Sequence, residues 1–175
     1  MSYVMSQRVR KFALTTHITV SVGWIGAVVA YLALAVTAVI SRDAQTLRAA
    51  FLSMELIAWY VLVPLGLASF VTGLVMSLGT RWGLFRHYWV VFSLLLTILA
   101  IVVLLTRLEP ISYRAALAAD PSTSSADLRS AGVLLHPGLG LLVLLVVTAL
   151  NVYKPNGLTP YGWRKIQEQR SESRT

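Results

Sequence analysis

Cysteine is absent from this sequence and charged residues are scarce. None of the 175 residues is a cysteine, which excludes disulfides, thiolate zinc sites, iron–sulfur clusters and cysteine nucleophiles. Only 13% of the residues are charged, whereas 57% are hydrophobic; ordinary soluble domains have about 25% charged residues. The chain therefore has the composition of an integral membrane protein.

The motifs of several common enzyme classes are also missing. The sequence contains no phosphate-binding glycine loop, no His-Glu-x-x-His zinc motif and no serine nucleophile elbow. It also contains no Cys-x-x-Cys-His segment, which would attach haem covalently. A function has to be inferred from single residues and from their depth in the membrane.

Four apolar runs are present, each close to or above the roughly 20 residues that a membrane-spanning helix needs. They cover residues 12–40, 54–78, 88–106 and 134–152. The first follows Arg8, Arg10 and Lys11, but it is far longer than the apolar segment of about 7–15 residues in a signal peptide. We predict an all-α, up-and-down four-helix membrane bundle over residues 1–153, followed by a basic tail at residues 154–175.

Basic residues predict how the chain is threaded, because Lys and Arg are retained on the cytoplasmic side of a membrane. If the N-terminus is cytoplasmic, most of the 15 Lys and Arg residues fall on that side. These are Arg8, Arg10, Lys11, Arg81, Arg86, Lys154, Arg164, Lys165, Arg170 and Arg174. We therefore expect both termini in the cytoplasm and the protein in the inner (cytoplasmic) membrane. The net charge of +8 then predicts contacts with anionic lipid headgroups, and no nucleic-acid partner.

Ionisable side chains within or beside apolar helices are candidate functional residues, because hydrocarbon penalises them. His17 lies two helical turns before Trp24, on the same face of the first expected helix, and His87 precedes the third. The expected topology places both histidines near the cytoplasmic surface. They predict a haem b site in which His17 and His87 ligate the iron, Trp24 shapes the pocket and Arg86 meets a propionate. The alternative is that both histidines are polar residues at the membrane interface and that no cofactor binds.

A second candidate pair, Glu55 and His136, is expected near the opposite surface. Ser53 is a plausible N-cap, so the simplest interpretation of Glu55 is a carboxylate at a helix start, where the helix dipole favours it. The alternative is a proton-handling or metal site shared with His136. Two protein ligands are too few to specify zinc.

Small residues indicate where the helices approach one another, since lipid-embedded helices associate through close packing. The first helix carries Gly23, Gly26, Ala27 and Ala30, and the second carries Ser69, Gly73 and Ser77. Pro64 interrupts the second helix and is expected to kink it.

Two strings carry a family resemblance. Residues 82–90 (WGLFRHYWV) and residues 153–162 (YKPNGLTPYG) resemble a family of four-helix integral membrane proteins of unknown function. His17, followed by Trp24 and by Gly26 and Ala27, resembles more distantly the first helix of the four-helix membrane protoporphyrinogen oxidase and of copper-resistance protein D relatives. The latter resemblance implies a haem associated with His17.

The preferred functional hypothesis is a membrane protein of redox type that binds haem b near its cytoplasmic face. One alternative is a non-catalytic scaffold, or a subunit of a larger membrane complex or homo-oligomer, that uses its small-residue faces. Another is a carrier of a small ion or solute that uses Glu55 and His136.

Overall fold

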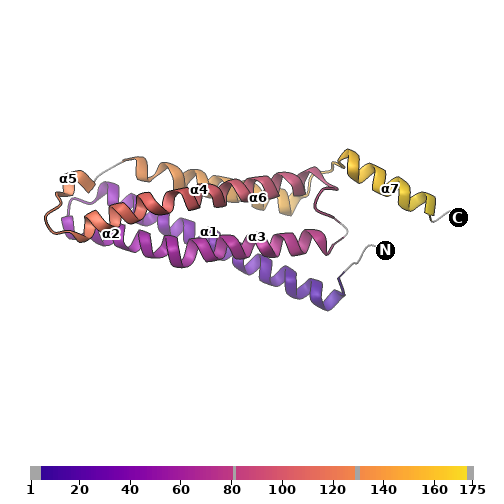
Figure 1. The fold of residues 1–175 in the computed structure, drawn as a ribbon, viewed down its shortest axis with the longest axis horizontal. Coiled ribbons are helices and arrows are strands. Elements are labelled where there is room, and N and C mark those ends of the chain that lie inside the picture. The colour runs from indigo at the N-terminus through magenta and orange to yellow at the C-terminus, as the bar shows by residue number, and fades with distance from the viewer. Residues whose placement is uncertain (1–4, 81, 129–130, 173–175) are drawn as a thin grey trace.

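The chain forms an elongated bundle of helices. The computed structural model describes residues 5–80, 82–128 and 131–172. Three basic residues used in the charge comparison, Arg81, Arg129 and Arg174, lie outside the described residues. The first helix begins at the same end of the bundle where α7 (Pro160–Glu172) follows the last long helix, and α5 (Ser125–Leu128) lies at the opposite end (Figure 1). We refer to these as the α7 end and the α5 end.

Four helices among the described residues are long and apolar enough to cross a membrane. They are α1 (Gln7–Ile40), the continuous helix Ala44–Leu78, α4 (Tyr88–Ala119) and α6 (Leu135–Tyr153). The second of these consists of α2 (Ala44–Ile57), the π-helical turn η1 (Ala58–Leu62) and α3 (Val63–Leu78). The predicted all-α bundle with four candidate membrane spans is confirmed.

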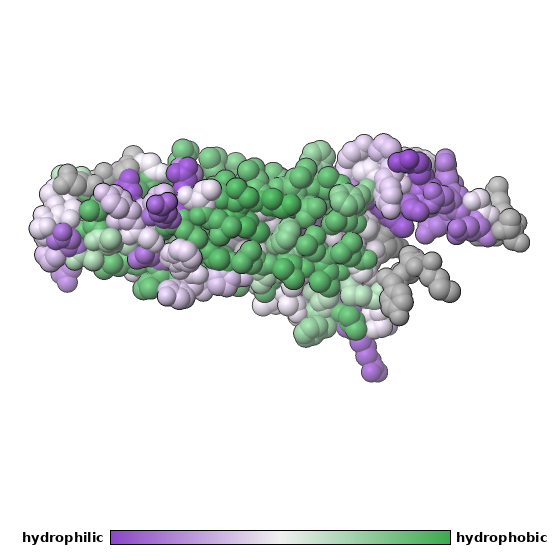
Figure 2. All heavy atoms as spheres, in the orientation of Figure 1, coloured by the Kyte–Doolittle hydropathy of each residue, from purple (hydrophilic) through white to green (hydrophobic). Residues whose placement is uncertain are grey.

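Three of these helices are longer than a bilayer requires. They contain 34, 35 and 32 residues, or about 50 Å at 1.5 Å per residue, whereas a hydrocarbon core is about 30 Å thick. Figure 2 shows a broad apolar band around the middle of the molecule with polar residues gathered at both ends. The bundle therefore extends past the apolar band toward the α5 end.

This extension corrects two predicted boundaries. The second span begins at Ala44, ten residues before the expected start at residue 54, and α4 continues to Ala119 instead of ending near residue 106. Residues 107–119, outside the third apolar run, are the last part of α4. Hydropathy identifies only the lipid-embedded part of a helix, so it does not reveal where a helix continues into a polar region.

The start of α2 is fixed by Asp43. Its carboxylate accepts hydrogen bonds from the Thr46 amide at 2.7 Å and from the Thr46 hydroxyl at 2.6 Å, the usual arrangement of an N-cap. These hydrogen bonds lower the pKa of the Asp43 carboxyl. Ser53 and Glu55 lie inside α2, so the interpretation of Glu55 as a helix-start carboxylate capped by Ser53 is wrong.

The most completely buried side chains lie toward the α5 end. They include Ala35, Leu47, Ala50, Phe51 and Met54, each at most 3% exposed. Away from this cluster, many aliphatic side chains in the apolar band point outward. Full burial is expected where water drives the packing, whereas side chains in lipid gain little by turning inward.

The second span contains a π-helical turn next to Pro64, where a kink was expected. In η1 the Val63 amide donates to the Ala58 carbonyl, five residues back, directly before Pro64. Proline has no amide hydrogen to donate, and a π turn redistributes the hydrogen bonds that this leaves incomplete.

The tail is more ordered than its composition indicates. Residues 167–172, in the polar part of the predicted basic tail, belong to α7. Lys165 and Glu168 form a salt bridge of 2.7 Å on its exposed surface.

At the α5 end, Arg48 joins α2 to the end of α4 and to the chain that follows it. Its guanidinium donates hydrogen bonds to the backbone carbonyls of Ala118, Asp120, Pro121 and Thr123. The first lies in the last turn of α4, where carbonyls have no partner within the helix. One cation from α2 therefore closes α4 and fixes the chain that follows it.

We expect Arg48→Gln to lower the free energy of unfolding by about 2 kcal/mol, because charge-assisted hydrogen bonds to these carbonyls are lost. Chemical unfolding of the detergent-solubilised protein measures this. Arg42→Gln is the matched control, since the Arg42 side chain is exposed. Equal stability of the two variants would contradict the role given to Arg48.

Candidate functional site

The candidate site is organised by the contact between α1 and α3, which run antiparallel. His17 meets Thr72 and Gly73, Ser21 meets Ser69, and Trp24 meets Gly66. The contacting residues have the same spacing on both helices. Ser21 follows His17 by four residues on α1, and Ser69 precedes Gly73 by four residues on α3. The next three residues, to Trp24 and Gly66, also match. One register thus places both rings of α1 against glycines of α3.

The two glycines make room for these rings. A Cβ atom at Gly66 would lie 3.0 Å from the Trp24 ring, and one at Gly73 would lie 3.3 Å from Cε1 of His17. By contrast, a Cβ at Gly26 would meet nothing within 4 Å. The small residues of α3 therefore receive large side chains from α1, whereas the predicted small-residue face at Gly26 and Ala30 is exposed.

The hydrogen bonds of His17 orient its imidazole. Nδ1 of His17 lies 2.9 Å from the Thr72 hydroxyl, and that hydroxyl lies 2.7 Å from the Ala68 carbonyl. A carbonyl can only accept, so the tautomer with its hydrogen on Nδ1 satisfies both contacts at once: Nδ1–H donates to the Thr72 oxygen, and the Thr72 hydroxyl donates to Ala68. This tautomer leaves the lone pair on Nε2 of His17.

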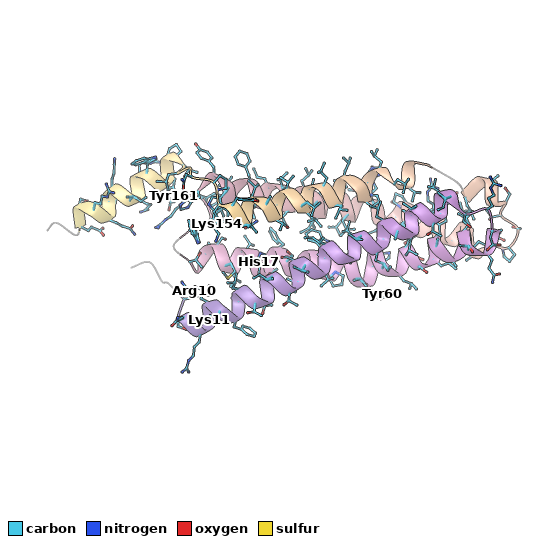
Figure 3. All side chains as sticks on the ribbon, turned by 180° about the vertical axis from the view of Figure 1, so that it is seen from behind. Arg10, Lys11, His17, Tyr60, Lys154 and Tyr161 are labelled. Carbon is cyan, nitrogen blue, oxygen red and sulfur yellow. The ribbon has the colours of Figure 1, made fainter. Side chains whose placement is uncertain are left out.

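His17 and Trp24 both line a cavity of about 630 Å³ between α1, α3, α4 and α6. Its volume lies in the range of roughly 300–1,000 Å³ typical of small-molecule sites. All four helices contribute polar groups, namely Ser21, Ser69, Ser93, Thr97, Thr148 and Asn151. The Asn151 amide donates to the Ser93 hydroxyl at 3.2 Å, which joins α6 to α4 across the site. Figure 3 shows His17 in the half of the bundle nearer the α7 end.

His87 is placed differently from His17. Its Nδ1 donates to the Trp82 carbonyl at 2.8 Å, and its ring packs edge-on against the Trp82 ring with 5.1 Å between centroids. Trp82 and Trp89 line the cavity, whereas His87 is not among the lining residues that the structure describes. The structure therefore places His17 and Trp24 together at the cavity, whereas Trp82 and Trp89 separate His87 from it.

The two strings that carry the family resemblance meet at this end of the cavity. His87 and Leu158 form an isolated antiparallel bridge, in which the Tyr88 amide donates to Gly157 at 3.2 Å and the Thr159 amide donates to Arg86 at 3.0 Å. Residues 82–90 and 153–162 are thus one structural unit, in which the chain after α6 is fastened to the turn before α4.

Among the described residues that line the cavity, Lys154 is the one with a positively charged side chain. It ends α6 in a left-handed conformation with φ of 45°, and its Nζ lies 5.4 Å from the centre of the Trp82 ring, as in a cation–π contact. Arg86, which the sequence suggested for this role, is not among the described lining residues. Sequence reasoning missed Lys154 because it was assigned to the tail.

The structure does not place Glu55 in the cavity that His136 lines, as far as the described residues go. His136, near the start of α6, lines a separate cavity of about 350 Å³ whose described lining residues do not include Glu55. Among the described residues, no group of three or more His, Asp or Glu side chains could hold a metal ion.

The ring-on-glycine packing predicts that Gly66→Leu and Gly73→Leu each destabilise the protein by about 1–3 kcal/mol, because the new side chain overlaps Trp24 or His17. Thermal or chemical unfolding in detergent measures this. Gly26→Leu, on an open face of α1, is the control and is expected to change stability little. A loss at Gly26 equal to that at Gly66 would contradict the packing.

Comparison with known proteins adds no assignment. No protein-family model, no curated protein and no solved structure matches the chain. Of the resemblance described above, what the structure supports is a protein with four long apolar helices.

Proposed function

We propose that this protein is a membrane protein of redox type that binds haem b in the cavity lined by His17. The observation that carries the proposal is the contact of His17 Nδ1 with the Thr72 hydroxyl, which also contacts the Ala68 carbonyl and thereby favours the tautomer with its lone pair on Nε2. Histidines that ligate metals commonly have this arrangement, in which a hydrogen bond to one ring nitrogen orients the other.

The surrounding residues suit a large, flat, amphipathic group. Trp24, Phe70 and Trp89 supply aromatic walls, and Lys154 supplies one positive charge. In this proposal His17 ligates the iron, Thr72 holds the imidazole, and Lys154 pairs with an acidic substituent of the porphyrin. When bound, haem b would supply one-electron redox chemistry.

His87 remains the second ligand that the sequence predicts. Its Nδ1–H is also engaged, by the Trp82 carbonyl, so its Nε2 likewise carries a lone pair. Ligation by His87 requires its ring to move past Trp82 or Trp89, because these side chains line the cavity and His87 does not. Ligation by His17 requires no such movement.

We expect the protein purified from haem-replete cells to show a Soret band, and His17→Ala to remove it. Thr72→Val retains the ligand but loses its orienting hydrogen bond, and we expect about tenfold weaker haem binding. His136→Ala is the matched control, because His136 lines the other cavity. Reduced-minus-oxidised difference spectra measure all three.

Absence of a Soret band in the wild-type protein, or an unchanged band after His17→Ala, would refute haem binding at this site. His87→Ala separates one-ligand from two-ligand binding. An unchanged spectrum indicates that His17 alone ligates the iron, and a high-spin spectrum indicates that His87 is the second ligand.

We also propose that the α7 end is cytoplasmic and that the protein resides in the cytoplasmic membrane. Arg8, Arg10 and Lys11 precede the apolar part of α1 at this end, and Lys154 lies there as well (Figure 3). The basic residues of α7 are then placed to meet anionic headgroups, each contributing about 1 kcal/mol near a charged surface.

Single cysteines test this topology cleanly, because the natural chain has none. Ser122 and Ser171 are both exposed, one beyond the end of α4 and the other in α7. A membrane-impermeant maleimide added to spheroplasts is expected to label Ser122→Cys and to label Ser171→Cys only after lysis. The reverse pattern would invert the proposed orientation.

A further inference from the structure

A second cavity, of about 350 Å³, lies between α1, η1, α4 and α6 on the α5 side of the cavity lined by His17. Trp24 and Leu144 line both cavities and are 4% and 5% exposed. They form a common wall, so the second cavity is a site of its own and not an extension of the first.

Polar groups gather at the end of this cavity away from the wall. Tyr31 lies two helical turns beyond Trp24 on α1, and His136 lies two turns before Leu144 on the antiparallel α6. Ala100 of α4 packs against the cluster that contains Trp24 and Leu144, and Arg107 lies two turns beyond it. At 1.5 Å per residue these three side chains start about 10 Å from the wall, and the rest of the lining is almost entirely apolar.

Gly140, near the start of α6, leaves space for this cavity. Gly140 lines it, and a Cβ placed on this glycine would meet nothing within 4 Å. Lipid-embedded helices ordinarily use glycine for close approach to a neighbour. Here the absent side chain leaves space, and Pro137 beside it lines the same cavity.

Arg107 is the positively charged residue among the described lining residues of this cavity, and its exposed side chain has no counter-charge in the described structure. The side chains of Arg107 and His136 form no hydrogen bond or ion pair with any described residue. No acidic side chain is among the described lining residues. An apolar chamber with donors at one end complements a molecule that has an apolar chain and a head of anionic oxygens, to which Arg binds through charge-assisted hydrogen bonds.

We propose that this cavity binds a single-chain amphiphile with an anionic head, its carboxylate or phosphate on Arg107 and His136 and its chain running toward Trp24. Carboxylates and phosphates share the chemistry that Arg107 recognises, and both a fatty acid and a single-chain phospholipid supply such a head. The site is independent of haem binding, because it lies on the other side of the wall formed by Trp24 and Leu144.

Quenching of Trp24 fluorescence by a bromine atom at the chain end of a probe tests the proposal. The probes are 11-bromoundecanoate, 11-bromoundecyl phosphate and the neutral 11-bromoundecanol, added to protein in phosphatidylcholine nanodiscs. Subtracting the signal of Trp24→Phe isolates this residue from the other tryptophans. We expect saturable quenching by both anionic probes, at a mole fraction about tenfold lower than the alcohol requires.

Variants locate the bound chain and head. Gly140→Leu fills the cavity and is expected to abolish saturable quenching, whereas Gly138→Leu, at a helix position that does not line it, is expected to leave quenching intact. Arg107→Gln is expected to weaken binding of the anionic probes about tenfold and to leave binding of the alcohol unchanged. Lys154→Gln, in the cavity lined by His17, is expected to have no effect.

The relative affinities of the carboxylate and the phosphate identify the source of the head, and preference for either over the alcohol supports the proposal. Equal quenching by the alcohol and the anionic probes would overturn it. Unchanged binding to Gly140→Leu, or a loss caused by Lys154→Gln and not by Arg107→Gln, would also overturn it. Haem content measured on the same samples reports on the cavity of His17 separately, so failure of one proposal is distinguishable from failure of the other.

Discussion

The contact between α1 and α3 is the interaction on which both cavities depend. Gly66 and Gly73 let two rings of α1 lie directly against the backbone of α3, and the Ser21–Ser69 hydrogen bond of 2.8 Å fixes the register between them. A shift of either helix along the other would move Trp24 and His17 off their glycines together. Because Trp24 forms part of the wall between the cavities, this register also sets where one ends and the other begins.

Different interactions stabilise the α5 end and the apolar band of the bundle. At the α5 end, buried apolar side chains and the Arg48 hydrogen bonds resemble the interior and caps of a soluble helical protein. In the apolar band, a few polar contacts between helices replace that core, as lipid-embedded packing requires. The Asn151–Ser93 hydrogen bond joins α6 to α4, and the chain that follows Lys154 is bonded to the turn before α4.

The sequence predicted the class of fold and the four long apolar helices well, because long apolar runs have few alternatives to spanning a membrane. It did not predict the ends of α2 and α4, where capping by Asp43 and Arg48 extends helices through polar surroundings. Gly73 was recognised as a packing residue, but Gly66 was not, since its role depends on which ring of α1 it receives. Arg86 lies in the turn before α4 and Lys154 at the end of α6, and only the tertiary fold decides which of them lines the cavity.

The wall formed by Trp24 and Leu144 bears on the kinds of function this bundle can support. A carrier must connect polar groups on both sides of the membrane, yet the described polar linings of the two cavities are separated by a nearly buried indole and a leucine. Passage of a hydrated ion or solute would require both side chains to move, and Trp24 is held against Gly66. A bound redox group needs no such opening, because only electrons have to reach a partner. The packing that fixes the first helix therefore favours two separate binding sites over one continuous path.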